Sequence, residues 1–124
     1  MEEKGNVCSG GPKLIFACSG AADVGAISDQ AARKLTSDGV GQMFCLAGIG
    51  GGIEAIMQKS KTASQILAID GCGLDCAKKT LANAEIHNFK QLRVTDLGLE
   101  KGKSQVNEEN INKVAIRGRK ILQN

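Results

Sequence analysis

The sequence predicts a small α/β domain with a mostly parallel, four-stranded sheet and helices on both faces of that sheet. Four short apolar runs have the character of buried strands, and stretches with helical spacing separate them. Strands that alternate with helices are joined by right-handed crossovers, and such crossovers build a parallel sheet covered on both sides. We therefore expect three layers, as in Rossmann-like and flavodoxin-like folds.

The predicted strands recur at regular intervals along the chain. The first covers Lys13–Ala17, directly after Pro12, which is the only proline. The other three cover residues 40–47, 65–70 and 92–97. Short apolar runs of this kind are typical of strands that are buried on both faces.

Helical spacing fills the intervals between these runs. We expect helices over residues 24–35, 53–57, 77–84 and 107–122. The first should end near Gly39, which readily takes the left-handed conformation that closes a helix. The second should stop where polar residues 59–62 break its pattern. The last carries the strongest signals, because Asn107 is a suitable N-cap and two glutamates follow it.

Length and composition fit one such domain. The chain has 124 residues, whereas domains commonly contain about 100 to 150. Hydrophobic residues make up 42% and charged residues 23%, which is typical of a globular chain and not of a disordered one. We interpret residues 1–12 as a flexible leader and residues 13–124 as a single domain.

The same composition argues against nucleic-acid and membrane partners. The net charge is only +3, the basic residues are scattered, and three phenylalanines are the only aromatic residues, so no surface for base stacking is evident. No apolar run approaches the roughly 18 to 20 residues that a membrane span needs, and the first residues lack the order of a secretion signal. We expect a cytoplasmic protein.

Four of the five cysteines occupy equivalent places in successive strand–helix units. Cys18 directly follows the first strand, Cys45 lies near the end of the second, and Cys72 and Cys76 lie at the turn after the third. The intervals from 18 to 45 and from 45 to 72 are both 27 residues. Because the carboxyl ends of parallel strands meet at one edge of a sheet, these thiols should converge there.

Converging thiols are suited to a metal ion. Four thiolates at about 2.3 Å satisfy zinc completely. The following helices begin at this edge, and their positive ends should favour thiolate over thiol and offset the charge of the centre, helped by Lys78 and Lys79. A buried cysteine is also simply a small core residue, and for Cys45, within an apolar run, that interpretation carries equal weight.

Four motifs that occur in order along the chain carry a resemblance. They are Phe-Ala-Cys-Ser-Gly at residues 16–20, Cys-Leu-Ala-Gly at 45–48, Asp-Gly-Cys at 70–72 with Cys76, and Val-Thr-Asp-Leu-Gly at 94–98. Together they resemble the DGC-domain family. The resemblance implies a small α/β metal-binding domain with four chelating cysteines, here Cys18, Cys45, Cys72 and Cys76, and no established reaction. The sequence departs from the pattern at Gly73, where relatives often carry proline, and Cys8 matches nothing in it.

Two other chemistries use the same residues. Cys72 and Cys76 would form the exchanging pair of a thiol redox or sulfur-transfer protein, with Cys18 or Cys45 as the resolving thiol. An iron–sulfur cluster on the four cysteines is a further, less favoured variant. A closed four-thiolate zinc site would stabilise or sense, for example in metal or metalloid handling, and would not activate water.

Several weaker signals remain. Glycines 50–52, ahead of a helix, could cradle a small anion with backbone N–H groups, although the spacing fails as a dinucleotide fingerprint. Asp23, Asp70 and Asp75 flank the cysteine turns, where carboxylates orient ligands, accept protons or cap helices. His87 lies far from the cysteines along the chain and is interpreted as a surface residue, so no catalytic triad is evident.

Overall fold

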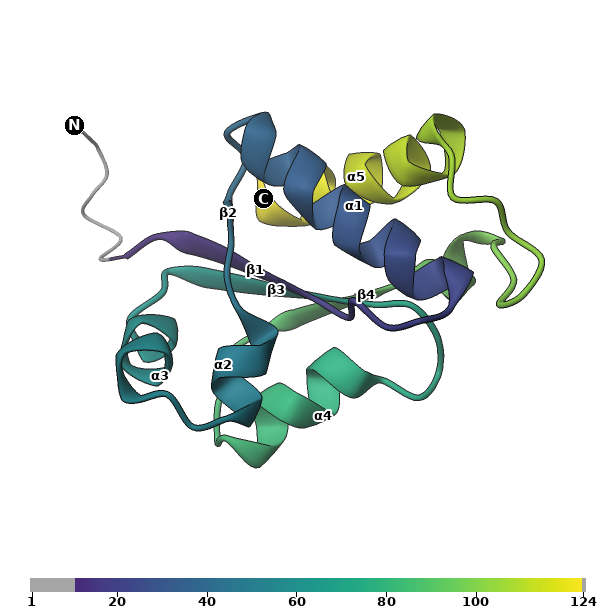
Figure 1. The fold of residues 1–124 in the computed structure, drawn as a ribbon. Coiled ribbons are helices and arrows are strands. Elements are labelled where there is room, and N and C mark those ends of the chain that lie inside the picture. Colours follow the sequence, from purple (N-terminus) through teal and green to yellow (C-terminus); the bar gives the residue numbers. More distant parts are fainter. Residues whose placement is uncertain (1–10, 124) are drawn as a thin grey trace.

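The computed structural model describes residues 11–123 and confirms the predicted class. Within that range the chain forms a four-stranded, all-parallel sheet in the order β2-β1-β3-β4. Helices α1 and α5 cover one face, and α2, α3 and α4 cover the other (Figure 1). The leader predicted over residues 1–12 lies almost wholly outside the described residues, as does Cys8.

The strands and helices alternate as expected. The elements in chain order are β1 Lys13–Ala17, α1 Asp23–Ser37, β2 Gln42–Met43, α2 Leu46–Gly50, α3 Glu54–Lys61, β3 Gln65–Asp70, α4 Cys76–Asn83, β4 Lys90–Arg93, a 3-10 helix Val94–Leu97 and α5 Glu108–Leu122. Asn107 caps α5 by accepting from the backbone N–H of Asn110, and Gly39 takes a positive φ after α1, as predicted.

The core has two parts, one on each face of the sheet. In β1, Ile15 and Ala17 pack toward α1 and α5, whereas Leu14 and Phe16 pack toward the other three helices. All four side chains are almost completely buried. This explains why β1 reads as a continuous apolar run and not as an alternating one.

Two predicted strands are shorter than expected. The prediction of a strand over residues 40–47 is wrong beyond Met43, because Cys45 acts as the N-cap of α2 and the chain turns into that helix. The prediction over residues 92–97 is wrong beyond Arg93, because β4 pairs with β3 and β3 ends at Asp70. A strand without a neighbour to pair with has no ladder to continue.

The second predicted helix is longer than expected. Helix α3 continues to Lys61, although residues 59–62 were predicted to break it. Ser60 is buried and its hydroxyl donates to the carbonyl of Ile56 at 2.7 Å, while Lys59 and Lys61 point to solvent. A polar pattern on the outer face of a helix is compatible with its continuation.

Candidate functional site

Cys18 lies at the carboxyl end of β1, at the point where the connections of the sheet diverge. Helix α1 follows β1 and covers one face, whereas α4 follows β3 and covers the other (Figure 1). Open α/β sheets hold their ligands in the crevice outside such a switch point. The backbone N–H of Cys18 donates to the carbonyl of Ile69 at 2.8 Å, which extends the pairing of β1 and β3 by one residue and fixes Cys18 beside the end of β3.

Glycines allow the two cysteine-bearing turns to approach each other. A Cβ on Gly25, in the first turns of α1, would lie 2.8 Å from the carbonyl oxygen of Gly20. A Cβ on Gly71 would lie 3.0 Å from the backbone nitrogen of Gly25. The turn after β3 therefore packs backbone to backbone on α1, and this contact brings Cys72 to the neighbourhood of Cys18.

A buried carboxylate holds the turn that carries Cys72 and Cys76. Asp70, at the end of β3, is fully buried and accepts hydrogen bonds from the backbone N–H groups of Ala77 at 2.6 Å and Lys78 at 3.1 Å. It thus caps α4 from outside the helix, which is the capping role that the sequence suggested for it. The side-chain amide of Gln91 donates to it as well, at 3.0 Å.

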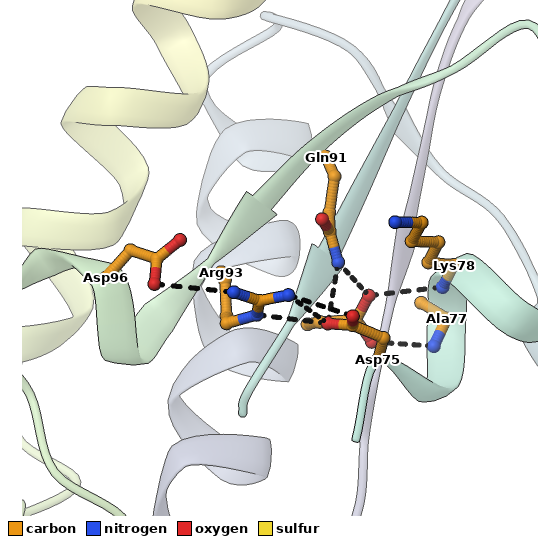
Figure 2. Close-up of polar contacts among 7 residues, drawn as sticks. Asp75, Ala77, Lys78, Gln91, Arg93 and Asp96 are labelled. Atoms are coloured by element: carbon orange, nitrogen blue, oxygen red, sulfur yellow. Dashed lines mark hydrogen bonds and ion pairs between the residues drawn. The ribbon is translucent and has the colours of Figure 1, made fainter. Parts of the chain in front are cut away.

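A second carboxylate, Asp75, ties the same turn to β4. Figure 2 shows Gln91 and Arg93 reaching from β4 toward Asp75. The Arg93 guanidinium donates to both carboxylate oxygens, with an Nη2 to Oδ2 distance of 2.8 Å. Although burial opposes it, hydrogen bonding from Arg93 and Gln91 lowers the pKa of Asp75. This ion pair holds Asp75 in a left-handed conformation, with φ of 56°, just before α4.

Three of the four predicted ligands share one neighbourhood. Although the Cys76 side chain is exposed, partial desolvation raises the pKa of its thiol. The charges of Cys18 and Cys72 raise this pKa further, as does the carboxylate of Asp70. A hydrogen bond with Cys18 acts in the same direction. Because only nearby groups affect ionisation in this way, Cys18 and Cys72 both lie in the neighbourhood of Cys76.

The ionisation of Cys76 differs from what its place at a helix start predicts. A helix N-terminus favours the thiolate, so a lowered pKa was expected. The expectation is wrong for Cys76, because desolvation and the neighbouring Cys18, Asp70 and Cys72 all raise its pKa. The surroundings of Cys76 therefore favour the neutral thiol, and a cation placed beside it would act in the opposite direction and favour the thiolate.

Cys45 lies at the same edge of the sheet but apart from this cluster. It is exposed, and its sulfur accepts from the backbone N–H of Gly48 at 3.3 Å, so it is not a core residue. It lines a cleft of about 590 Å³. Ala17 and Ser19, the two neighbours of Cys18 in the chain, line the same cleft. The cleft therefore connects Cys45 with the Cys18 turn.

One residue that the sequence did not single out touches the cluster. The ammonium of Lys101 lies 3.7 Å from the sulfur of Cys72, across 29 residues of chain. No local pattern in the sequence around Lys101 could have placed it at the site. Arg93 and Gln91 were also missed, although they alternate along β4 and so share a face.

The donor chemistry of the cluster suits a soft or borderline metal, since all three groups are thiols. In residues 11–123, however, no three histidine, cysteine, aspartate or glutamate side chains are arranged so that they could hold a metal ion. All four cysteines in that range are free. His87 is exposed and precedes β4, at the opposite edge of the sheet, as its interpretation as a surface residue predicted.

The other sequence signals have structural roles. The backbone N–H groups of Gly51, Gly52 and Ile53 already donate to carbonyl groups of α2, so they cannot also cradle an anion. Asp23 is the first residue of α1, whose N-cap is Ala22; its carboxylate accepts from the backbone N–H of Val24 at 2.7 Å and from the backbone of a distant loop. No helix in the described part of the chain is long and apolar enough to cross a membrane.

Comparison with known proteins gives a consistent result. A family model described as the DGC domain matches residues 14–117. The anaerobic and virulence modulator AnvM of Pseudomonas aeruginosa is 34% identical over 88 residues, which cover 71% of this chain and 67% of that protein. No solved structure matches this chain significantly.

Proposed function

This chain belongs to the DGC domain family, and on that premise we propose that it is a cytoplasmic zinc-binding protein. In this proposal Cys18, Cys72 and Cys76 form the centre of the site and Cys45 is the fourth ligand. The single observation that carries it is the proximity of three thiols from two separate strand–helix turns, close enough to alter the ionisation of Cys76. When bound, zinc would join these turns and neutralise their negative charge.

Several features of the chain support a resident cation. The pKa of Cys76 is raised by partial desolvation and by surrounding negative groups, so a nearby positive ion would favour its thiolate. Asp70 and Asp75 hold the turn rigidly by hydrogen bonds to α4 and β4. A preformed turn lowers the entropic cost of assembling ligands around an ion. The free cysteines agree with a reducing compartment.

The proposed role is sensing or handling of the ion. Four thiolates leave no open position for an activated water. The name of the relative in Pseudomonas aeruginosa describes a modulator, which is a regulatory role. We propose a regulatory role for this chain as well, in which binding or loss of zinc at the cysteine site is the signal.

Elemental analysis of protein purified without chelator tests the proposal. We expect one zinc per chain, and we expect Cys18→Ser, Cys72→Ser and Cys76→Ser each to lose it. Cys45→Ser should retain zinc with weaker affinity, because the remaining three thiols stay together. Cys8→Ser is the matched control and should bind as the unchanged protein does. Substoichiometric zinc that Cys72→Ser leaves unaltered would refute the proposal, and a brown colour on anaerobic purification would indicate an iron–sulfur cluster instead.

A thiol redox function is the second candidate, and the effect of Cys18 on the pKa of Cys76, which places the two thiols near each other, favours it. In this alternative the exchanging pair is Cys18 and Cys76, and not the Cys72–Cys76 pair that the sequence suggested. Oxidised glutathione would accept two electrons and two protons as the two thiols form a disulfide. Peptide mapping after mild oxidation should then find a Cys18–Cys76 link, whereas four thiols that stay reduced would exclude this function.

A further inference from the structure

A loop of residues 98–105, which we call the strap, lies against the cysteine site. It runs from the end of the 3-10 helix toward α5, with positive φ at Gly98 and Gly102. The strap is ordered internally, because the hydroxyl of Ser104 accepts from the backbone N–H of Glu100 at 2.7 Å and donates to its carbonyl at 2.9 Å. It is a folded segment and not an open loop.

Asp23 fixes the strap to the start of α1. One carboxylate oxygen accepts from the backbone N–H of Gly102 at 2.9 Å, and the other accepts from Ser104 at 3.0 Å. These bonds span about 80 residues of chain, as the separations of 79 and 81 show. Asp23 also follows the Cys18 turn directly, so one carboxylate couples the position of the strap to that of Cys18.

The strap brings a positive charge to the cluster at one point. Lys101 lies between Glu100, which bonds to Ser104, and Gly102, which bonds to Asp23. Its ammonium reaches the sulfur of Cys72 at 3.7 Å. Lys103, two residues further on, instead faces Glu100 at 3.7 Å. The two lysines are therefore equal in charge and nearly equal in sequence position, but only Lys101 contacts a cysteine.

We propose that the strap, pinned by Asp23, delivers Lys101 to Cys72 in order to compensate the negative charge of the thiol site and to slow the release of its ion. The second half of this statement rests on the proposed function, since it requires a bound metal. The first half does not. A centre of several thiolates around one divalent ion carries excess negative charge, and an ammonium held beside a ligand sulfur stabilises it.

The first test uses metal-free, reduced protein and measures the potential at Cys72. Iodoacetate is anionic and iodoacetamide is neutral, and both alkylate the thiolate. The ratio of their rates at Cys72 therefore reports local charge and not the fraction of thiolate. Fragmentation of the tryptic peptide separates Cys72 from Cys76. We expect Lys101→Met to lower the iodoacetate to iodoacetamide ratio by about fivefold, the effect of one charge at about 4 Å in water. Lys103→Met is the control and should leave it unchanged.

Asp23→Ala removes the hydrogen bonds that hold the strap but keeps the charge of Lys101. It should lower the same ratio while Lys101 is still present, and the amides of Gly102 and Ser104 should exchange hydrogen faster. Lys101→Met should change the ratio without changing that exchange. An equal ratio in the unchanged protein and in Lys101→Met would overturn the proposal, whatever the metal content.

The second test adds zinc and follows its transfer to a competing chelator. Lys101→Met and Asp23→Ala should each raise the rate of release by about fivefold, and the difference should shrink at high salt. If Lys101→Met lowers the alkylation ratio but the protein binds no zinc, the effect of Lys101 on Cys72 stands and only the proposed function is refuted. Unaltered release from Lys101→Met, in protein that does bind zinc, would refute the role of the strap in retaining the ion.

Discussion

The turns after β2 and β3 carry cysteines at equivalent places in their strand–helix units, yet they are built differently. The turn after β3 is fixed by two carboxylates, Asp70 and Asp75, that bond to α4 and β4. The turn after β2 follows a strand of two residues, and one bond to the sulfur of Cys45 caps its helix. Equal spacing in sequence thus gives one rigid and one lightly held thiol position. The difference shows that anchoring polar groups, and not spacing, define the site.

The largest expected effect comes from removing the buried anchor. Asp70→Ala should lower the free energy of unfolding by about 3 kcal/mol, because the amides of Ala77 and Lys78 lose a buried acceptor. Urea denaturation followed by circular dichroism measures this. Asp70→Asn keeps one acceptor oxygen and should cost less. If both variants unfolded like the unchanged protein, the turn after β3 would not be the rigid one.

The close approach of the turn after β3 to α1 provides the next test. Gly71→Ala should cost about 2 kcal/mol, because its Cβ would meet the backbone of Val24 and Gly25 at 3.0 Å. The same unfolding measurement on Gly73→Ala is the control, since a Cβ there meets nothing within 4 Å. A similar loss in both variants would show that the alanine, and not the contact with α1, is responsible.

The lightly held turn should tolerate change. Cys45→Ala removes the acceptor for the Gly48 amide, yet it should alter the free energy of unfolding by only about 0.5 kcal/mol, since the site is exposed and sulfur is a weak acceptor. Thermal unfolding of Cys45→Ala and of Asp70→Ala, measured under the same conditions, compares the two turns directly. A loss at Cys45 equal to that at Asp70 would abolish the distinction between them.

The smallest effect concerns acidic pH and separates the strap from the turn after β2. Hydrogen bonds from the backbone of Gly102 and Ser104 lower the pKa of Asp23. The contribution of these bonds is therefore complete above the unfolded value of about 4, and it is lost as the pH falls through the lower folded value. The amide resonances of Gly102 and Ser104 should titrate together in that acidic range.

The Gly48 amide, which bonds to Cys45, serves as the internal reference for this titration and should not follow the same curve. Asp23→Asn removes the titrating carboxylate and should flatten the response of the strap. Movement of Gly102 and Ser104 that persists in Asp23→Asn would mean that another group holds the strap.

Local patterns in the sequence were sufficient for the layers and for the edge of the sheet at which the cysteines lie. The continuous apolar run of β1 requires burial on both faces, and a parallel sheet places Cys18, Cys45 and Cys72 at one edge. The caps of α5 and the turn at Gly39 are equally local. Strand lengths are not a local property, because a strand continues only as far as its neighbour does, which is why β4 ends at Arg93.

Tertiary structure alone decided which thiols meet and how they ionise. Cys18 approaches Cys72 and Cys76 because the glycine backbones of two distant turns pack together, and no spacing rule encodes that contact. Asp70 and Cys72 are near Cys76 in the chain, but Cys18, which also raises the pKa of Cys76, comes from the turn after β1. Lys101 joins the site for the same reason, since Asp23 holds its loop across about 80 residues. Electrostatic interactions depend on distance in space, and only the folded chain sets those distances.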